Sequence, residues 1–223
     1  MTDKILTGEK VRLVFTNIEE DAKLIAEWDR DSEYQRLLNG DPANRISPGK
    51  IKEWYEKEIG SITFFMIERL EDGKRIGLID LAGFNYAARS AWVGIGIGER
   101  DLWGLGYGTD AMRVLLRYAF EQMNLNRVTL NVFEFNQRGY RSYEKAGFKL
   151  EGRLSKVLVK AGKRYDLIFM GCLRRDWEAL QPAVVLVSAP IPQAAPANWV
   201  STLEHGWVTV IYQDGKIWLE GER

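Results

Sequence analysis

Cysteine and histidine are almost absent from this sequence: Cys172 and His205 are the single examples among 223 residues. One cysteine excludes an internal disulfide and a thiolate metal cluster, and one histidine removes most zinc chemistry and most catalysis by a histidine base. We therefore expect no bound metal and a reducing, cytoplasmic setting.

The sequence also lacks a net charge and a long apolar run. Lysine plus arginine and aspartate plus glutamate number 31 each, so no bulk attraction to nucleic acid or to an anionic membrane is built in. The first residues, MTDKILTGEKVRLV, contain no apolar signal core, and no apolar run reaches the roughly 20 residues of a membrane span. We expect a soluble protein without nucleic-acid or membrane partners.

Strand and helix patterns alternate through the first 181 residues. Strands are predicted at residues 11–17, 63–70, 74–84, 90–98, 127–135, 148–159 and 164–173. Helices are predicted at 18–31, 44–58 and 137–147, and between a glycine-rich stretch and Met123; Asn17 and Ser47 are the expected caps of the first two. Short turns join the three middle strands, which indicates an antiparallel meander. The fold class predicted is α+β.

The composition changes after Trp177. We expect one domain at residues 1–181, a proline- and alanine-rich linker at 182–198, and a β-hairpin extension at 199–223 that turns at Asp214 and Gly215. The linker segment VVLVS could also form a short strand. Two strands alone are marginally stable in water, so the hairpin must pack on the main domain or on another chain.

The stretch LWGLGYGTDAMRVLLRYAF sets Gly104, Gly106 and Gly108 directly before a helix. Glycines at a helix amino terminus let an anion approach the unpaired backbone amides, although a tight turn alone would also use them. The spacing does not fit a dinucleotide-binding motif, and no lysine completes a Walker loop. A second glycine run, GIGIG at 94–98, indicates a bulge or the close approach of a backbone-like group. Together they predict a slot for a long molecule with a pyrophosphate.

The chain resembles the Gcn5-related N-acetyltransferase (GNAT) superfamily, in the branch of ribosomal-protein N-terminal and spermidine acetyltransferases. The glycine-rich stretch carries the resemblance, together with LNRVTLNVFEFNQRGYRSYEKAGFKLEGRL and GKRYDLIFMGCL. Gly106 and Gly108 match the pyrophosphate pattern of that family. Trp103 stands where the family has glutamine or arginine, and Leu105 where lysine is common. The resemblance implies a mixed, mostly antiparallel sheet that splays at the cofactor site, with flanking helices.

The resemblance also implies where acetyl-CoA binds, between the strands at 90–98 and 127–135. Pantetheine would bond the backbone near Ile95, Gly96 and Ile97. Pyrophosphate would rest on the amides of Gly104, Leu105, Gly106, Tyr107, Gly108 and Thr109. Asn136 matches the asparagine that contacts pantetheine, although asparagine is also a preferred helix cap.

The resemblance assigns Tyr143 to the tyrosine that faces the thioester sulfur. A core tyrosine at helical spacing is the alternative, and a phenol with a pKa of about 10 acts more readily as a hydrogen-bond donor than as a full acid. No base is certain: Glu134 and Asp80 are candidates on strands near the cleft, and water is another. The acidic cluster Asp29, Asp31 and Glu33 could attract a cationic acceptor, or could be a solvated helix end.

The function that the resemblance implies is transfer of an acetyl group from acetyl-CoA to a primary amine by direct attack. The amine could belong to a protein N-terminus, a polyamine or another small molecule. The alternative is a coenzyme A sensor, in which the same fold binds the cofactor and the hairpin engages a protein. A homodimer is expected, with the hairpin either adding to the dimer contact or covering the acceptor cleft.

Overall fold

The computed structural model describes residues 4–40, 44–181, 183–185, 208–213 and 216–221, and side chains only up to residue 181. The chain divides into two compact units, Met1–Trp177 and Glu178–Arg223. The predicted linker lies almost wholly outside the described residues, as do Asp214 and Gly215. The predicted domain boundaries therefore stay a prediction.

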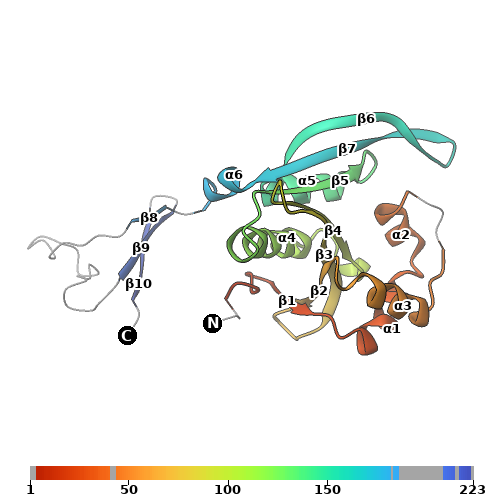
Figure 1. Cartoon of the computed structure of the whole chain (residues 1–223), viewed down its shortest axis with the longest axis horizontal. Helices are drawn as coiled ribbons and strands as arrows, with labels where there is room; N and C mark the ends of the chain where they lie inside the picture. Colours follow the sequence, from red (N-terminus) through yellow and green to blue (C-terminus); the bar gives the residue numbers. More distant parts are fainter. Residues whose placement is uncertain (1–3, 41–43, 182, 186–207, 214–215, 222–223) are drawn as a thin grey trace, which may run out of the picture. The chain divides into compact units, whose positions relative to one another are not determined.

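The first unit is built on one mixed sheet, which Figure 1 shows with its flanking helices. Its strands lie in the order β1-β2-β3-β4-β5-β7-β6. Their bounds are β1 Val11–Phe15, β2 Thr63–Arg69, β3 Arg75–Asn85, β4 Ser90–Ile97, β5 Arg127–Phe133, β6 Lys149–Lys160 and β7 Lys163–Leu173. The predicted α+β class, the middle meander and the splayed sheet are confirmed.

The splay arises at the single parallel junction, between β4 and β5. These strands pair only at three positions, from Ser90 opposite Arg127 to Trp92 opposite Thr129. Beyond this point β4 stays paired to β3, and β5 stays paired to β7. One edge of each strand is therefore left without a strand partner, and a groove opens between them.

The helices differ from the prediction in one place that matters for the site. The helix predicted at residues 18–31 ends at Trp28, and a further short helix, which the sequence did not predict, begins at Ser32. Asp31 is the reason, because its carboxylate accepts hydrogen bonds from the amides of Glu33 and Tyr34 and caps the new helix. The helices are α1 Ile18–Trp28, α2 Ser32–Leu38, α3 Pro48–Glu58, α4 Tyr107–Arg117, α5 Gln137–Ala146 and α6 Arg174–Glu178, with a 3₁₀ turn at Arg100–Leu102 and a π turn at Tyr118–Gln122.

The two predicted caps behave differently. Ser47 accepts a hydrogen bond from the amide of Lys50 at 3.3 Å, as predicted. Asn17 occupies the cap position of α1 without a side-chain bond, and its own amide donates to Asp21 instead. The predicted position of the Asn17 cap is thus correct, but the expected hydrogen bond from its side chain is not formed.

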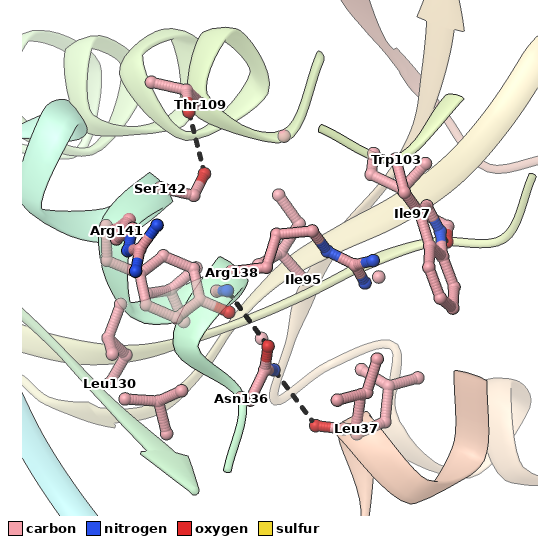
Figure 2. A pocket seen from close by; sticks show the side chains of 18 of the residues that line it. Leu37, Ile95, Ile97, Trp103, Thr109, Leu130, Asn136, Arg138, Arg141 and Ser142 are labelled. Atoms are coloured by element: carbon pink, nitrogen blue, oxygen red, sulfur yellow. Dashed lines mark hydrogen bonds between the residues drawn. The ribbon is translucent and has the colours of Figure 1, made fainter. Parts of the chain in front are cut away.

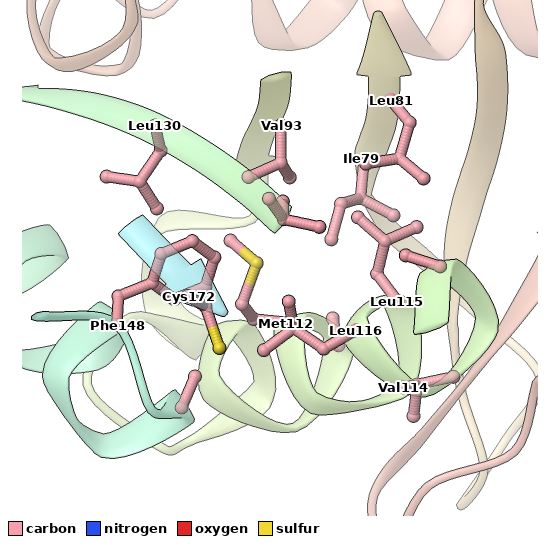
Figure 3. Close-up of a cluster of buried hydrophobic side chains, with 14 of the residues drawn as sticks. Ile79, Leu81, Val93, Met112, Val114, Leu115, Leu116, Leu130, Phe148 and Cys172 are labelled. Carbon is pink, nitrogen blue, oxygen red and sulfur yellow. The ribbon is translucent and has the colours of Figure 1, made fainter. Parts of the chain in front are cut away.

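The sheet is buried on both faces, which explains the continuous apolar run of β2. Phe65 and Ile67 belong to the larger core cluster with α4, whereas Phe64 and Met66 belong to a second cluster with α1, α2 and α3. Figure 3 shows the larger cluster, in which Met112, Leu115 and Leu116 of α4 pack near Ile79, Leu81, Val93 and Leu130 of the sheet. The packing fixes the amino terminus of α4 beside β4.

The second unit contains a three-stranded sheet in the order β10-β9-β8. Strands β9 Val208–Gln213 and β10 Lys216–Gly221 are the predicted hairpin, and β8 Ala183–Val185 is the short strand that the linker was able to form. Within the part of the chain that the structure describes, no helix combines the length and apolar character needed to cross a membrane.

Candidate active site

The groove between β4 and β5 is the centre of the candidate site. It encloses ≈ 620 Å³, within the usual range of small-molecule sites. Residues of β3, β4, β5, α2, α4 and α5 line it, together with the loop before α4 (Figure 2). Of the predicted site residues it brings together Ile95, Gly96, Ile97, Gly104, Gly106, Tyr107, Gly108, Thr109, Asn136 and Tyr143, whereas Leu105 and Glu134 lie outside the lining.

The glycines of β4 make room for three side chains rather than for a bulge. A Cβ at Gly94 would lie 2.7 Å from Asp80 Oδ1, one at Gly96 2.4 Å from Tyr34 Oη, and one at Gly98 2.1 Å from the Trp28 ring. The register between β3 and β4 is regular from Gly77–Ile97 to Ala82–Trp92. The predicted bulge is therefore wrong, and the close approach is by side chains on the face of α1 and α2.

The backbone of β4 offers its groups to the groove at alternate residues. The amide of Gly98 donates to Ile76 on β3, so the alternating groups of Gly96 also face β3. Ile97 faces the other way, because its carbonyl accepts a hydrogen bond from Trp103 Nε1 at 2.7 Å. By the same alternation both backbone groups of Ile95 face the groove, while those of Gly96 do not.

The amino terminus of α4 forms a cradle for an anion. Gly106 is its cap residue, in the left-handed conformation at φ 92°, and no side chain caps the helix. The first amides of α4 are thus left for a ligand, and the helix dipole favours negative charge there. A Cβ at Gly104 would meet nothing within 4 Å, so the approach is open. This arrangement fits the pyrophosphate of acetyl-CoA.

Two basic side chains that the sequence did not indicate lie at this cradle, although residues 103–109 contain none. Lys10 Nζ donates to the carbonyl of Leu105 at 3.0 Å. Asp110 holds that segment in place, because its carboxylate accepts from the amide of Lys10 at 2.7 Å. Within the described residues Lys10 forms no ion pair. The contact joins residues 95 positions apart, which leaves no local signal in the sequence.

Arg138 is the second basic side chain. Its guanidinium lies 3.8 Å from the centroid of the Trp103 ring, and Figure 2 shows it extended across the groove from α5. Burial lowers the pKa of this guanidinium. Since the side chain reaches from one wall to the other without forming an ion pair among the described residues, it is available to a negatively charged ligand.

Asn136 and Tyr143 each make the capping or packing contact that the sequence allowed, and each also lines the groove. Asn136 caps α5 by accepting from the amide of Gly139 at 2.9 Å, and it also lines the groove. Tyr143 packs against the core, with its ring 6.3 Å from that of Phe148, and it lines the groove as well. Burial raises the pKa of Tyr143 to about 12. Its hydroxyl is thus a hydrogen-bond donor at neutral pH.

The two candidate bases differ sharply in their surroundings. Glu134 accepts a hydrogen bond from the amide of Asp166 at 2.9 Å and lies 3.6 Å from Lys156 Nζ. Asp80 lines the groove, and burial raises its pKa to about 7. A half-buried carboxyl group in a groove, with its pKa raised toward neutrality, is a candidate proton acceptor.

The acidic cluster is occupied by arginines. Besides capping α2, Asp31 accepts from Arg100 Nε at 2.8 Å. Glu33 accepts from Arg36 at 2.6 Å. The two pairs neutralise these carboxylates, and burial raises the pKa of Asp29. The contacts of this cluster are therefore those of a helix cap and of ion pairs, and they favour that role over a site for a cationic acceptor.

Comparisons with known proteins agree with this geometry. A model of the GNAT acetyltransferase domain matches residues 12–149. The putative ribosomal N-acetyltransferase YdaF of Bacillus subtilis is 35% identical over 109 residues, which span 49% of this chain and 59% of that protein. The spermidine N(1)-acetyltransferase of Escherichia coli is 28% identical over 162 residues, or 72% of this chain and 84% of that protein. The structure of a Vibrio cholerae spermidine N-acetyltransferase with CoA and spermine superposes with a TM-score of 0.68 at 25% identity, and covers 75% of this chain and 98% of that one.

Proposed function

The chain belongs to the GNAT acetyltransferase family and transfers an acetyl group from acetyl-CoA to an amine, and we propose that its acceptor presents a single primary amine. The α-amino group at the N-terminus of a peptide is the acceptor that the site supports best. The observation that carries this proposal is the charge of the groove.

Asp80 is the one carboxylate among the described residues that line the groove. A polyamine brings several ammonium groups, and each one that leaves water without an anionic partner carries a desolvation penalty. The other charged side chains of the lining, Arg138, Arg141 and Lys145, are all basic and offer no partner to further cations. One carboxylate matches one ammonium.

The surroundings of Asp80 suit the rest of a peptide. Apolar and aromatic side chains also line the groove, among them Tyr34, Leu37, Leu38, Trp92 and Phe133. Such a lining accommodates the side chain of an N-terminal residue, and it offers nothing to the second and third ammonium groups of a polyamine. The acidic residues of the Asp31 region do not compensate, because they are paired with Arg100 and Arg36.

The chemistry of the attacking nitrogen supports the same acceptor. An α-amino group has a pKa of about 8 and is roughly one-tenth neutral at pH 7, whereas an alkylammonium with a pKa near 10.4 is neutral less than about 0.1% of the time. The α-amine therefore presents far more of the reactive form. A site with one carboxylate therefore has to deprotonate a smaller fraction of an α-amine than of an alkylammonium.

Tyr143 stabilises the leaving group. Acetyl-CoA, when bound, supplies the acetyl group as a thioester, and the sulfur becomes a thiolate when the amine takes its place. With a pKa of about 12, Tyr143 would protonate a thiolate of pKa near 8.5 only at a free-energy cost of about 5 kcal/mol. We assign it the role of hydrogen-bond donor to the developing thiolate.

A polyamine is the second candidate acceptor, because the relatives described above include spermidine acetyltransferases. Thiol release from acetyl-CoA separates the two when the acceptors carry one, two and three ammonium groups. For propylamine, 1,3-diaminopropane and spermidine we expect kcat/KM to fall along the series, and a short peptide with a free α-amine to exceed all three. A rise along the series would establish a polyamine acceptor.

Three finer expectations also belong to this proposal: a cytoplasmic location, a homodimer, and a role for the second unit. Support for pairing comes from β6, an edge strand with exposed apolar side chains at Leu150, Leu154, Val157 and Val159. Truncation after Gln181, followed by light scattering and thiol release, tests the dimer and the extension. Unchanged mass and activity would show that the extension serves neither.

A further inference from the structure

Asp80 lies on β3 beside the point where β4 and β5 separate. It lies in the middle of β3, opposite Phe64 of β2 on one side and Gly94 of β4 on the other. Its carboxylate lies over the backbone of Gly94, 2.7 Å from where a Cβ would stand. Gly94 is two residues beyond Trp92, the last residue of β4 that pairs with β5. The carboxylate therefore lies beside the point where the two strands separate.

No group in the described part of the chain satisfies this carboxylate, since it has neither a hydrogen bond nor an ion pair there. Burial alone accounts for the rise of its pKa to about 7. The other ionisable side chains in the lining are Tyr34, Tyr107, Arg138, Arg141, Tyr143 and Lys145. The strands that contain or adjoin it add Glu68 and Arg69 on β2 and Arg75 on β3, and α1, α2 and α3 on the same face carry further acidic and basic side chains.

A second polar group on the same face of β4 also lacks a partner in the described part of the chain. The hydroxyl of Tyr34 is buried without a hydrogen-bond partner among the described residues, and its side chain is 3% exposed. It lies over Gly96, two residues along β4 from Gly94. Asp80 is thus left without a partner from the residues that the structure describes, in a groove that fits a ligand, so a polar group of the ligand can pair with its carboxylate.

We propose that Asp80 is the general base that accepts a proton from the acceptor amine. The nitrogen forms the new C–N bond at the acetyl carbon, the C–S bond breaks, and its electron pair leaves with the sulfur as thiolate. The proton released from nitrogen passes to Asp80, and Tyr143 donates a hydrogen bond to the sulfur. The inference rests on amine acetylation and holds for either acceptor class.

The test compares the wild type with Asp80→Asn across pH. The ionisation of the free amine affects both enzymes equally, so it cancels in the ratio of their kcat/KM values. We expect this ratio to reach about 10² to 10⁴ at high pH, and to fall about tenfold per pH unit below an apparent pKa of about 7. Acetyl-CoA should bind Asp80→Asn as tightly as the wild type, which shows that the variant folds.

A second variant guards against a purely structural effect. Asp80→Ala leaves a small space at the groove, and we expect added formate to restore part of its activity, because a free carboxylate can accept the proton there. Asp72→Asn, at an exposed carboxylate in the turn between β2 and β3, is the matched control and should keep the wild-type profile.

A ratio near one, or a ratio independent of pH together with no formate rescue, would overturn the proposal. The loss appearing in Glu134→Gln instead would move the base to Glu134 and overturn it as well. If the wild-type enzyme released no thiol with any amine, the acetyl-transfer function itself would be contradicted. If wild type and Asp80→Asn were equally active, only the role of Asp80 would be contradicted.

Discussion

The carboxylate of Asp80 fills the space that a side chain at Gly94 would need, with 2.7 Å between Oδ1 and the position of a Cβ. The absence of a side chain on one strand thus sets the position of a charged group on the next. Contacts this short do not occur for real Cβ atoms, so a larger residue at Gly94 must displace the carboxylate.

Gly94→Ala should therefore lower kcat while leaving acetyl-CoA binding within about twofold of the wild type. We expect a loss of about tenfold to a hundredfold, because the base is displaced but not removed. Gly152→Ala on β6 is the control, since a Cβ there meets nothing within 4 Å. Steady-state thiol release measures kcat, and calorimetry measures the affinity for acetyl-CoA. Full activity in Gly94→Ala would show that the position of Asp80 is not critical.

Tyr143→Phe should lower kcat by roughly tenfold to a thousandfold and leave the affinity for acetyl-CoA nearly unchanged. The variant removes one donor that acts mainly on the developing thiolate. Tyr118→Phe, at a tyrosine of the core outside the groove lining, serves as the matched control. Equal kcat values for Tyr143→Phe and the wild type would return Tyr143 to a packing role.

Lys10→Ala and Arg138→Ala should each weaken acetyl-CoA binding about tenfold, because each removes a charge-assisted contact to the pyrophosphate. Acetylpantetheine, which lacks the pyrophosphate, should bind the variants and the wild type alike. Arg100→Ala is the control, because Arg100 also lies by Trp103, 5.4 Å from the ring centroid, but is paired with Asp31. Equal weakening for both ligands would contradict a pyrophosphate contact.

Asp80→Asn should stabilise the fold at high pH. The pKa of Asp80 is about 7 in the folded protein and about 3.9 in an unfolded chain, so the folded state binds more protons between these values. The wild type therefore loses stability as pH rises from about 4 to 7, by at most about 4 kcal/mol. Urea unfolding at pH 5 and pH 8 measures the difference between wild type and variant.

Asp72 provides a comparison for the direction of this pH effect on stability. The Arg69 guanidinium beside Asp72 lowers the pKa of that carboxyl group to about 2, so its contribution to stability is lost only on acidification. Asp72→Asn should not stabilise the protein at pH 8. A stability gain in Asp72→Asn, or none in Asp80→Asn, would contradict the assigned ionisation of Asp80.

The elements near the cofactor cradle could be predicted because their signals are local. Glycine spacing before α4, the capping position of Asn136 and the meander turns all act over a few residues. Asp31 shows where local reading fails: its place in a charged run suggested the end of one helix, whereas its carboxylate begins another. That second helix brings Tyr34, Leu37 and Leu38 to the groove.

The remaining features depend on register and on distant contacts. Asp80 meets Gly94 only because β3 and β4 pair in one particular register, and a shift of one residue would turn its side chain to the other face. Lys10 reaches Leu105 because Asp110 binds the N-terminal segment. Neither arrangement follows from composition or periodicity. The sequence therefore predicts a cradle before α4, and it leaves open the basic side chains at the cradle and the choice between Asp80 and Glu134 as the base.

The central claim, acetylation of a single primary amine, is tested most directly by competition in one reaction. Wild-type enzyme and acetyl-CoA are mixed with equal concentrations of spermidine and of a tripeptide whose only amine is its α-amino group. Mass spectrometry then measures the initial rate at which each is acetylated. We predict that the acetylated tripeptide forms at least about tenfold faster than acetylated spermidine, because a larger fraction of the α-amine is neutral. Faster acetylation of spermidine would contradict the account.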